Sequence, residues 1–286
     1  MAAEMPPALA PYLPGDLRSA ERDQLRNGVV RLATVYRQDE GSAILPLAAA
    51  IRAGNAKAAL AQLRAGAPSV QFVEVAGERV TEAEIADVRA DAEEAGTRLV
   101  DAARRGDAFA ALEALGAHRL MLAHRRGPAG VAHWAALVED WVTEAAGPDG
   151  AADAPWHPGR PLLVTANDRE TGLYNGDTGV VVADGAGGVV AVFGDPARPV
   201  RVRPHRLRAV ETVHAMTVHR GQGSQFVKVS IVLPPATSPL LTRELLYTAV
   251  TRASGSVRVV GTEEAVRKAV TTPVRRASGL REPLRE

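Results

Sequence analysis

The segment 215–226 gathers the side chains of this sequence best suited to contact phosphate groups. It reads A-M-T-V-H-R-G-Q-G-S-Q-F and offers hydroxyl, imidazole and amide groups at Thr217, His219, Gln222 and Ser224. Gly221 and Gly223 carry no side chain and would let a ligand backbone approach closely. A surface turn with its usual glycines explains the segment equally well. The residues alone leave both interpretations open.

Two arginines follow elements that could carry them to an anionic ligand. Arg252 ends a helical segment, 242–252, whose apolar face is expected to be buried. An arginine in a last turn also complements the helix dipole by about 0.3–1 kcal/mol, and this bland explanation suffices for Arg252 taken alone. Arg37 follows a β-branched run at 29–32. It is a surface arginine by default and a phosphate clamp if a cleft adjoins it.

The residues that are missing exclude several kinds of chemistry. Cysteine is absent, which rules out disulfides, thiolate nucleophiles and cysteine-ligated metal centres. No lysine follows a glycine, so there is no G-x-x-x-x-G-K-[ST] loop to hold nucleotide phosphates. The seven histidines lack metal-ligand spacing such as H-E-x-x-H, and no metal site is expected.

The charge balance limits how the chain can meet a polyanion. Lys+Arg 34 against Asp+Glu 33 gives a net charge of +1, so only local basic patches could attract nucleic acid. One basic run spans 198–208 and is either a DNA-facing stripe, which we favour, or a charged, solvated strand edge. The first residues do not have the pattern expected of a signal peptide, and no window of this sequence reaches about 18 uninterrupted apolar residues. Together with the absent cysteine, this predicts a cytoplasmic protein.

The order of elements predicts an α/β fold, with helices covering a parallel sheet. Residues 1–28 are expected to be a loosely ordered lead-in and 273–286 a flexible tail. The first part of the α/β lobe, with a helical segment, is placed at 29–157, and its second part at 210–272. Between them, the short β segments and turn residues of 158–209 favour an inserted small β-barrel.

Two details of the helical segment can be predicted more closely. Thr81 and Glu84 have the spacing of a capping box before a helix that ends near Gly106. Pro128 is expected to open another helix, on which Trp134 and Trp141 share an apolar face. Both patterns indicate core packing rather than chemistry.

Each of three segments could by itself be an ordinary surface turn or helix end. Their combination and order favour a functional interpretation. Residues 29–37, 215–226 and 242–253 resemble motifs IV, V and VI of superfamily 1 DNA helicases, and most closely those of the RecD type. Residues 161–181 are similar to the family's strand and N-G-D-x-G turn at the entry to its small β-barrel. The resemblance implies the second of two RecA-like lobes, with ATP between the lobes and single-stranded DNA crossing both.

The resemblance also implies roles for individual residues. Arg37 and Arg252 would reach the γ-phosphate of ATP as catalytic groups. Gln222 and Gly223 would couple DNA contact to the nucleotide, and Gln225, which stands where the family usually has glutamate, would accept from the ribose. Arg220 and Gly221 replace a usual Lys-Ser pair. The implied DNA contacts are Thr217, His219, Arg220, Ser224, Asn175, Arg201 and Arg203.

The function implied is the C-terminal motor lobe of a 5′→3′ RecD-type helicase acting in double-strand break repair and recombination. Its ATP and Mg²⁺ would be shared with an N-terminal RecA-like lobe missing from these residues, and this chain alone would bind neither and hydrolyse no ATP. The implied partners are single-stranded DNA and RecB-like and RecC-like subunits of an exonuclease V complex. A stand-alone single-stranded DNA-binding module and a partner-docking adaptor remain as alternatives.

Overall fold

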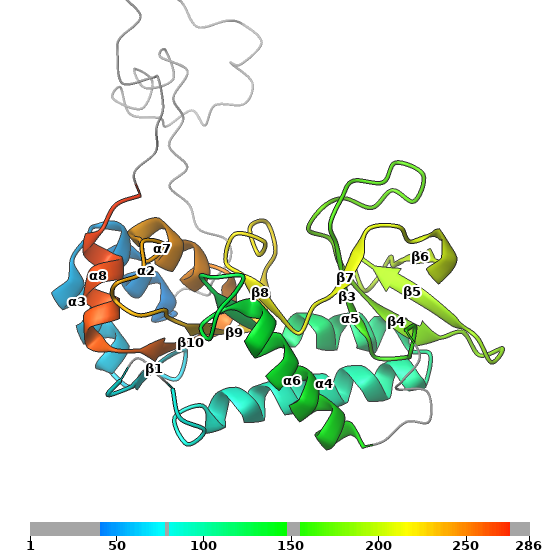
Figure 1. The fold of residues 1–286 in the computed structure, drawn as a ribbon, viewed down its shortest axis with the longest axis horizontal. Coiled ribbons are helices and arrows are strands. Elements are labelled where there is room, and N and C mark those ends of the chain that lie inside the picture. Colours follow the sequence, from blue (N-terminus) through cyan, green and yellow to red (C-terminus); the bar gives the residue numbers. More distant parts are fainter. Residues whose placement is uncertain (1–40, 78–79, 148–154, 275–286) are drawn as a thin grey trace, which may run out of the picture. The chain divides into compact units, whose positions relative to one another are not determined.

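A parallel sheet organises the described part of the chain, which in this computed structural model comprises residues 41–77, 80–147 and 155–274 (Figure 1). All neighbouring strands run parallel, in the order β1-β10-β9-β2-β8. Their bounds are β1 Val70–Glu74, β2 His118–Leu122, β8 Ala215–Thr217, β9 Phe226–Val232 and β10 Ala253–Gly261. The predicted α/β class is confirmed.

Helices cover both faces of this sheet, as Figure 1 shows. One apolar cluster joins the sheet to α2 (Ile44–Arg52), α3 (Ala56–Arg64), α7 (Arg243–Val250) and α8 (Glu263–Thr271). A second cluster joins the opposite face to α4 (Ala86–Arg104) and α6 (Val131–Ala146). Central strands buried on both faces read as almost continuous apolar runs, which is why they were recognisable in the sequence.

Local side-chain hydrogen bonds set several helix starts. The bonds of the predicted capping box are present, since the Thr81 N–H donates to the Glu84 carboxylate at 2.7 Å, but they lie in the turn before α4. The N-cap residue of α4 is Ile85, which makes no side-chain capping bond. The Thr242 hydroxyl accepts from the Leu245 N–H at the start of α7. The prediction for Pro128 was wrong in position: α6 begins at Val131, and Pro128 lies in the turn closed by the Gly130 N–H and the Gly127 carbonyl.

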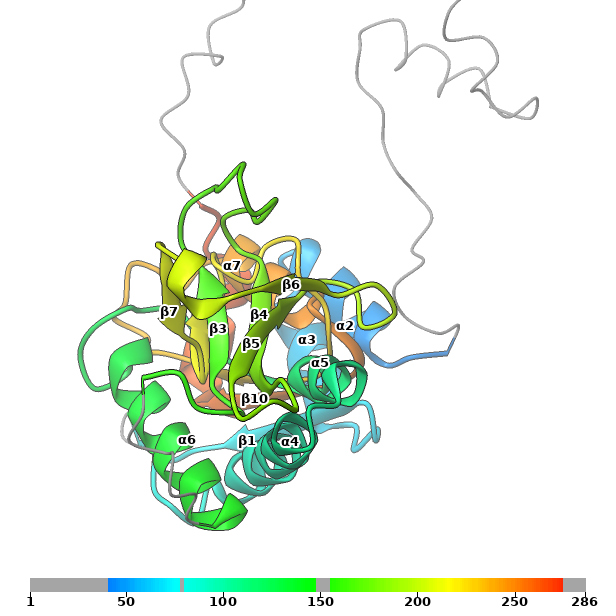
Figure 2. The same cartoon turned by 90° about the vertical axis from the view of Figure 1, so that its right-hand side faces the viewer.

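A second, antiparallel sheet occupies the predicted insertion (Figure 2). Its order is β6-β5-β4-β3-β7. The strands are β3 Pro161–Val164, β4 Thr178–Ala183, β5 Val189–Phe193, β6 Val200–Val202 and β7 Val210–Thr212. The predicted closed barrel is not confirmed, because β6 and β7 form open edges and do not pair with each other among the described strands. Each edge strand has three residues, which limits its exposed backbone without closure.

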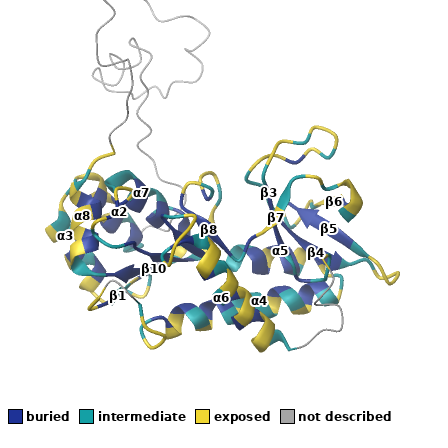
Figure 3. Cartoon of the chain, in the orientation of Figure 1, coloured by how far each residue is buried: buried dark blue, intermediate teal, exposed yellow. Residues whose placement is uncertain are grey.

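Much of the antiparallel sheet is buried (Figure 3), and its apolar side chains pack on both of its faces. Val180 and Val182 of β4 pack against α4 and α5 (Ala108–Ala117), while Val181 points into a separate cluster on the other face. This alternation is the period of two expected of a strand. Because α4 and α5 cover one face of the sheet, its apolar side chains are buried without closure into a barrel.

The antiparallel sheet is entered and left by neighbouring strands. β3, the first strand, pairs with β7, the last, through Leu162 and Thr212. The Val213 N–H then donates to the Pro161 carbonyl at 3.1 Å before the chain continues into β8. The two ends of the insertion therefore lie side by side.

A buried ionic cluster attaches α4 to the parallel sheet. The Asp91 carboxylate pairs with Arg258 of β10 and with Lys228 of β9. Arg258 also donates to the Asp87 carbonyl at 3.0 Å, and its Nε has no hydrogen-bond partner. The Asp91 side chain is 10% exposed and that of Arg258 is 7% exposed, so water can compensate little of this charge.

No helix within the described ranges is long and apolar enough to cross a membrane.

Candidate functional site

The segment 218–225, called the return loop below, connects opposite edges of the parallel sheet. Thr217 at the end of β8 pairs with Leu122, and Leu122 pairs with Val232 at the end of β9. The loop must return to Phe226 at the start of β9, which is about 20 Å away along the strand. It therefore begins at the carboxyl edge of the sheet and ends at the amino edge.

Backbone turns hold the return loop in place. The Val218 N–H donates to the Leu122 carbonyl at 2.9 Å. Further along, the Gly221 N–H donates to the Thr217 carbonyl at 3.1 Å, and the Ser224 N–H to the Gly221 carbonyl at 3.2 Å. With its own hydrogen bonds made, the loop is an ordered connection between the two edges.

The two glycines of the loop have different structural reasons. A Cβ on Gly221 would lie 2.8 Å from the Met121 Cε and 3.4 Å from the Met216 Sδ, so the residue is small because the loop packs onto the sheet. Gly223 has open space around it but a φ of +91°, a conformation that side-chain-bearing residues rarely adopt. Neither feature requires a ligand.

Helix α7 lies beside the return loop over most of its length. His219 and Gln222 line a cavity of about 260 Å³ together with Thr242 and Thr248 of α7. At the far end, the Arg252 Nη1 donates to the Ser224 carbonyl at 3.1 Å and its Nε to the Thr248 carbonyl at 3.2 Å. Arg252 is buried, and its guanidinium joins the two segments that resemble motifs V and VI.

The predicted contacts within the loop differ in their exposure. His219, Gln222, Gly223 and Gln225 are exposed, whereas Thr217 is buried and its hydroxyl accepts from the Arg220 N–H at 3.3 Å. Ser224 and Arg220 are half-buried, and Arg220 forms an ion pair with Glu211.

The amino-edge end of the loop opens onto a second cavity. Gly223, Ser224 and Gln225 line this space of about 610 Å³ together with α5 and the turn 176–178. The wall includes the carboxylates of Glu113 and Asp177. The structure thus brings Gln225 beside the antiparallel sheet, on the same edge as Arg252.

Other predicted residues lie apart from the return loop. Arg201 and Arg203 are exposed on and just after the edge strand β6, and neither lines the cavities that the loop lines in the described structure. Arg203 pairs with Asp184 at 2.6 Å, which lowers the pKa of that carboxyl. Asn175 is exposed, and its N–H donates to the Asn167 side chain at 2.8 Å. Arg37, with the whole segment 29–37, lies outside the described residues.

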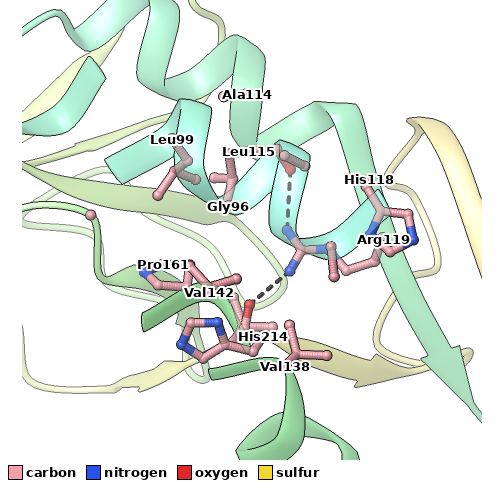
Figure 4. Close-up of a pocket in the computed structure, with 14 residues that line it drawn as sticks. Gly96, Leu99, Ala114, Leu115, His118, Arg119, Val138, Val142, Pro161 and His214 are labelled. Atoms are coloured by element: carbon pink, nitrogen blue, oxygen red, sulfur yellow. Dashed lines mark hydrogen bonds between the residues drawn. The ribbon is translucent and has the colours of Figure 1, made fainter. Parts of the chain in front are cut away.

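Arg119 of β2 was not singled out from the sequence, yet it joins three segments. It is buried and donates to the Val213 carbonyl at 2.7 Å and the Leu115 carbonyl at 3.3 Å, bonds drawn dashed in Figure 4. Its guanidinium lies 5.0 Å from the centre of the Phe226 ring, at the end of the return loop. Burial lowers the pKa of Arg119 to about 10. A charged residue inside an otherwise apolar strand, R-L-M-L, was the available signal.

Two partly buried histidines line the small cavity, of about 50 Å³, beside Arg119 (Figure 4). His118 shares a hydrogen bond of 2.9 Å with the Ser230 hydroxyl, and burial lowers its pKa from 6.5 to about 3. Burial likewise lowers the pKa of His214 to about 4. Both imidazoles are therefore neutral in the folded protein at neutral pH.

These histidines predict a loss of stability in mild acid. Because both folded-state pKa values lie below 6.5, the unfolded chain binds more protons from about pH 6.5 downward. The free energy of unfolding should therefore fall between pH 7 and 5, by up to about 1.4 kcal/mol per pH unit for each histidine. Urea unfolding at pH 7, 6 and 5 measures it. His118→Gln should reduce the slope, and a free energy that stays constant over this range contradicts the prediction.

The fold and the site together define a class of protein. The parallel sheet with helices on both faces is an α/β RecA-like lobe, and residues 212–260 match the family model of the UvrD-like helicase C-terminal domain. That match spans β8, the return loop, α7 and nearly all of β10.

The similarity to particular proteins extends further along the chain. It is 47% identical over 253 residues to the RecBCD enzyme subunit RecD of Mycobacterium tuberculosis, covering 88% of this chain and 42% of that protein. It is 48% identical over 258 residues to the same subunit of Mycolicibacterium smegmatis, covering 90% and 44%. The resemblance to RecD-type helicases is confirmed, and the chain spans less than half the length of these relatives.

A solved structure gives a weaker likeness. The Pif1 helicase from Bacteroides, in complex with ADP-AlF3 and ssDNA, is 16% identical with a TM-score of 0.41, covering 88% of this chain and 61% of that one. That score is too low to support an assignment.

Proposed function

We propose that this chain forms the second motor lobe of a RecD-type DNA helicase. The observation that carries the proposal is the course of the return loop, which starts at the carboxyl edge of the sheet and ends against Arg252 at the amino edge. The return loop would thereby connect a DNA contact at the carboxyl edge of the sheet to the Arg252 guanidinium at the amino edge. A guanidinium is suited to bind phosphate.

In this proposal the return loop and the residues next to it contact two ligands. Thr217 and His219 meet the DNA strand, and Arg252 and Gln225 meet ATP. Gln222 and Gly223 lie between them along the loop. The arginine and the amide fit a triphosphate and a ribose chemically, but the sequence lacks a P-loop to hold the phosphates. ATP with its Mg²⁺ would therefore be held mainly by another RecA-like lobe, and bound ATP would supply the phosphoryl transfer that drives movement.

The finer assignments rest on the relatives and the predicted motifs. We place the lobe in residues 29–157 and 210–272, with 158–209 as its insertion, and keep Arg37 as a second γ-phosphate contact. The relatives are named as subunits of the RecBCD enzyme. RecB-like and RecC-like partners, and a role in double-strand break repair, are proposed for this chain on that basis.

Single-stranded DNA binding by the intact chain tests the proposal. Each phosphate contact should contribute about −0.7 to the slope of log affinity against log salt concentration. Arg220→Ala should reduce the slope by about 0.7 if Arg220 meets a phosphate, because one charge contact is lost. Fluorescence anisotropy with a labelled oligo(dT) measures both.

Arg267→Ala is a suitable control, since Arg267 pairs with Glu263 on α8, away from the return loop. It should leave the slope unchanged. Binding that does not respond to salt, or an unchanged slope in Arg220→Ala, contradicts the proposed DNA contact.

A further inference from the structure

A basic groove lies at the carboxyl edge of the parallel sheet, beside the start of the return loop. It encloses about 600 Å³, within the range of small-molecule sites. Val232 and Leu233, at the end of β9, contribute apolar surface together with Val80 and Pro235. Residues of the turn after β2 and the first turns of α6 complete the described lining. In open sheets of parallel strands, this is the edge where ligands bind. We call it the carboxyl-edge groove.

The charge of this groove suits an anion. Arg126 and His133 are exposed on its lining, and Arg126 forms no ion pair with a described residue. Among the described residues, the lining contains no carboxylate. The amino-edge cavity of similar volume carries Glu113 and Asp177 instead. Of these two large spaces, the carboxyl-edge groove is therefore the one in which a phosphate meets no like charge from the described lining residues.

Contacts with buried neighbours orient two histidines of the groove. The His124 Nε2 shares a hydrogen bond of 2.8 Å with the hydroxyl of Ser238, which is buried. His133 meets the buried Trp134 ring edge-to-face, with 6.2 Å between ring centres. An exposed imidazole held in this way is a flat surface on which a nucleobase can stack with little loss of side-chain freedom.

The groove is continuous with the segment proposed to contact DNA. Val218 bonds the Leu122 carbonyl, two residues before His124. On the other side, the chain after Pro235 of the groove leads to Pro239 and Leu240, which line the cavity containing His219. A ligand running along this edge could therefore occupy both spaces.

We propose that the carboxyl-edge groove binds one nucleotide of single-stranded DNA, next to the contact made by the return loop. Arg126 holds a phosphate, and the unstacked base lies against His133 and the apolar floor. A base paired within a duplex could not enter a pocket of this kind, so the site selects single strand. This inference rests on the proposed function and extends its DNA path.

Two adjacent arginines provide a matched test in the intact chain. Arg126 lines the groove, whereas the equally exposed Arg125 does not. With oligo(dT), Arg126→Ala should reduce the salt slope by about 0.7 and Arg125→Ala should leave it unchanged. Equal effects of the two substitutions would overturn the assignment of the phosphate to Arg126.

The base contact needs a separate measurement. Oligonucleotides with one abasic position, moved along the strand, should show a position where affinity falls about fivefold or more. In the His133→Ala variant, an abasic nucleotide at that position should no longer lower the affinity. The thermal unfolding temperature should stay unchanged because His133 is exposed. A penalty that persists in His133→Ala would overturn the base contact.

The two proposals can fail separately. If Arg220→Ala lowers the slope and Arg126→Ala behaves like Arg125→Ala, the groove is wrong and the proposed function stands. If the intact chain binds no single-stranded DNA at any salt concentration, both are wrong.

Discussion

Arg252→Ala is expected to lower ATP turnover by about two to five decades, measured in a polypeptide that joins this chain to an ATP-binding lobe. An arginine that stabilises charge on a transferring phosphoryl group contributes mainly in the transition state. Affinity for single-stranded DNA should therefore remain nearly unchanged. The carbonyls of Ser224 and Thr248 hold the guanidinium at the end of the return loop, so its position depends on that loop.

Two further variants sharpen this result. Arg252→Lys keeps the charge but loses the fork that donates to both carbonyls, and turnover should fall between wild type and Arg252→Ala. Arg267→Ala removes an exposed arginine of α8 and should leave turnover unchanged. A loss confined to DNA affinity would assign Arg252 to the strand rather than to the nucleotide.

Asp91→Ala is expected to lower the free energy of unfolding by about 3–5 kcal/mol. The substitution leaves Arg258 buried without its carboxylate, and a buried charge that loses its partner is costly because water cannot replace the interaction. Lys228 is more exposed and can turn toward solvent. Urea unfolding at neutral pH measures the difference.

The same helix offers a matched control for this prediction. Glu93, also on α4, pairs with Arg89 at a half-buried position where its side chain is 29% exposed, against 10% for Asp91, and Glu93→Ala should cost less than about 1 kcal/mol. Replacing both buried partners, Asp91→Leu with Arg258→Met, should recover part of the stability lost in Asp91→Ala. Equal losses of unfolding free energy in Asp91→Ala and Glu93→Ala would contradict the prediction, because burial of the Asp91–Arg258 pair would then add nothing to its contribution.

Elements with strong local signals were predictable from the sequence. The apolar run at β9 and the helical spacing of α4, with the capping-box bonds in the turn before it, both appear where expected. Strands β1, β7 and β8 were missed because they are short and exist through pairing with distant segments: β8 has three residues and pairs with β2. The intrinsic strand propensity of a three-residue segment does not reveal a pairing partner that lies far away in the sequence.

The structure brings Arg252 into contact with the return loop, and the roles assigned to these residues stay predictions. Neighbouring helicase motifs placed Arg252 and the return loop in one site, but not the bond from Arg252 to the Ser224 carbonyl. The packing of Gly221 on Met121 depends on a strand nearly a hundred positions earlier in the chain. The carboxyl-edge groove was hidden because the segment around Pro128 was interpreted as the start of a helix.

The adjacency of β3 and β7 has a consequence for how such proteins can evolve. Since the inserted sheet leaves the parent lobe and rejoins it through two hydrogen-bonded neighbours, its outer hairpins can lengthen, shorten or be exchanged without moving β8. Both faces must keep their apolar character, one because it packs on α4 and α5 and the other because it forms a buried cluster of its own. Sequence drift among homologues should therefore concentrate in the β4–β5 and β5–β6 connections, where changes leave the parallel sheet in place.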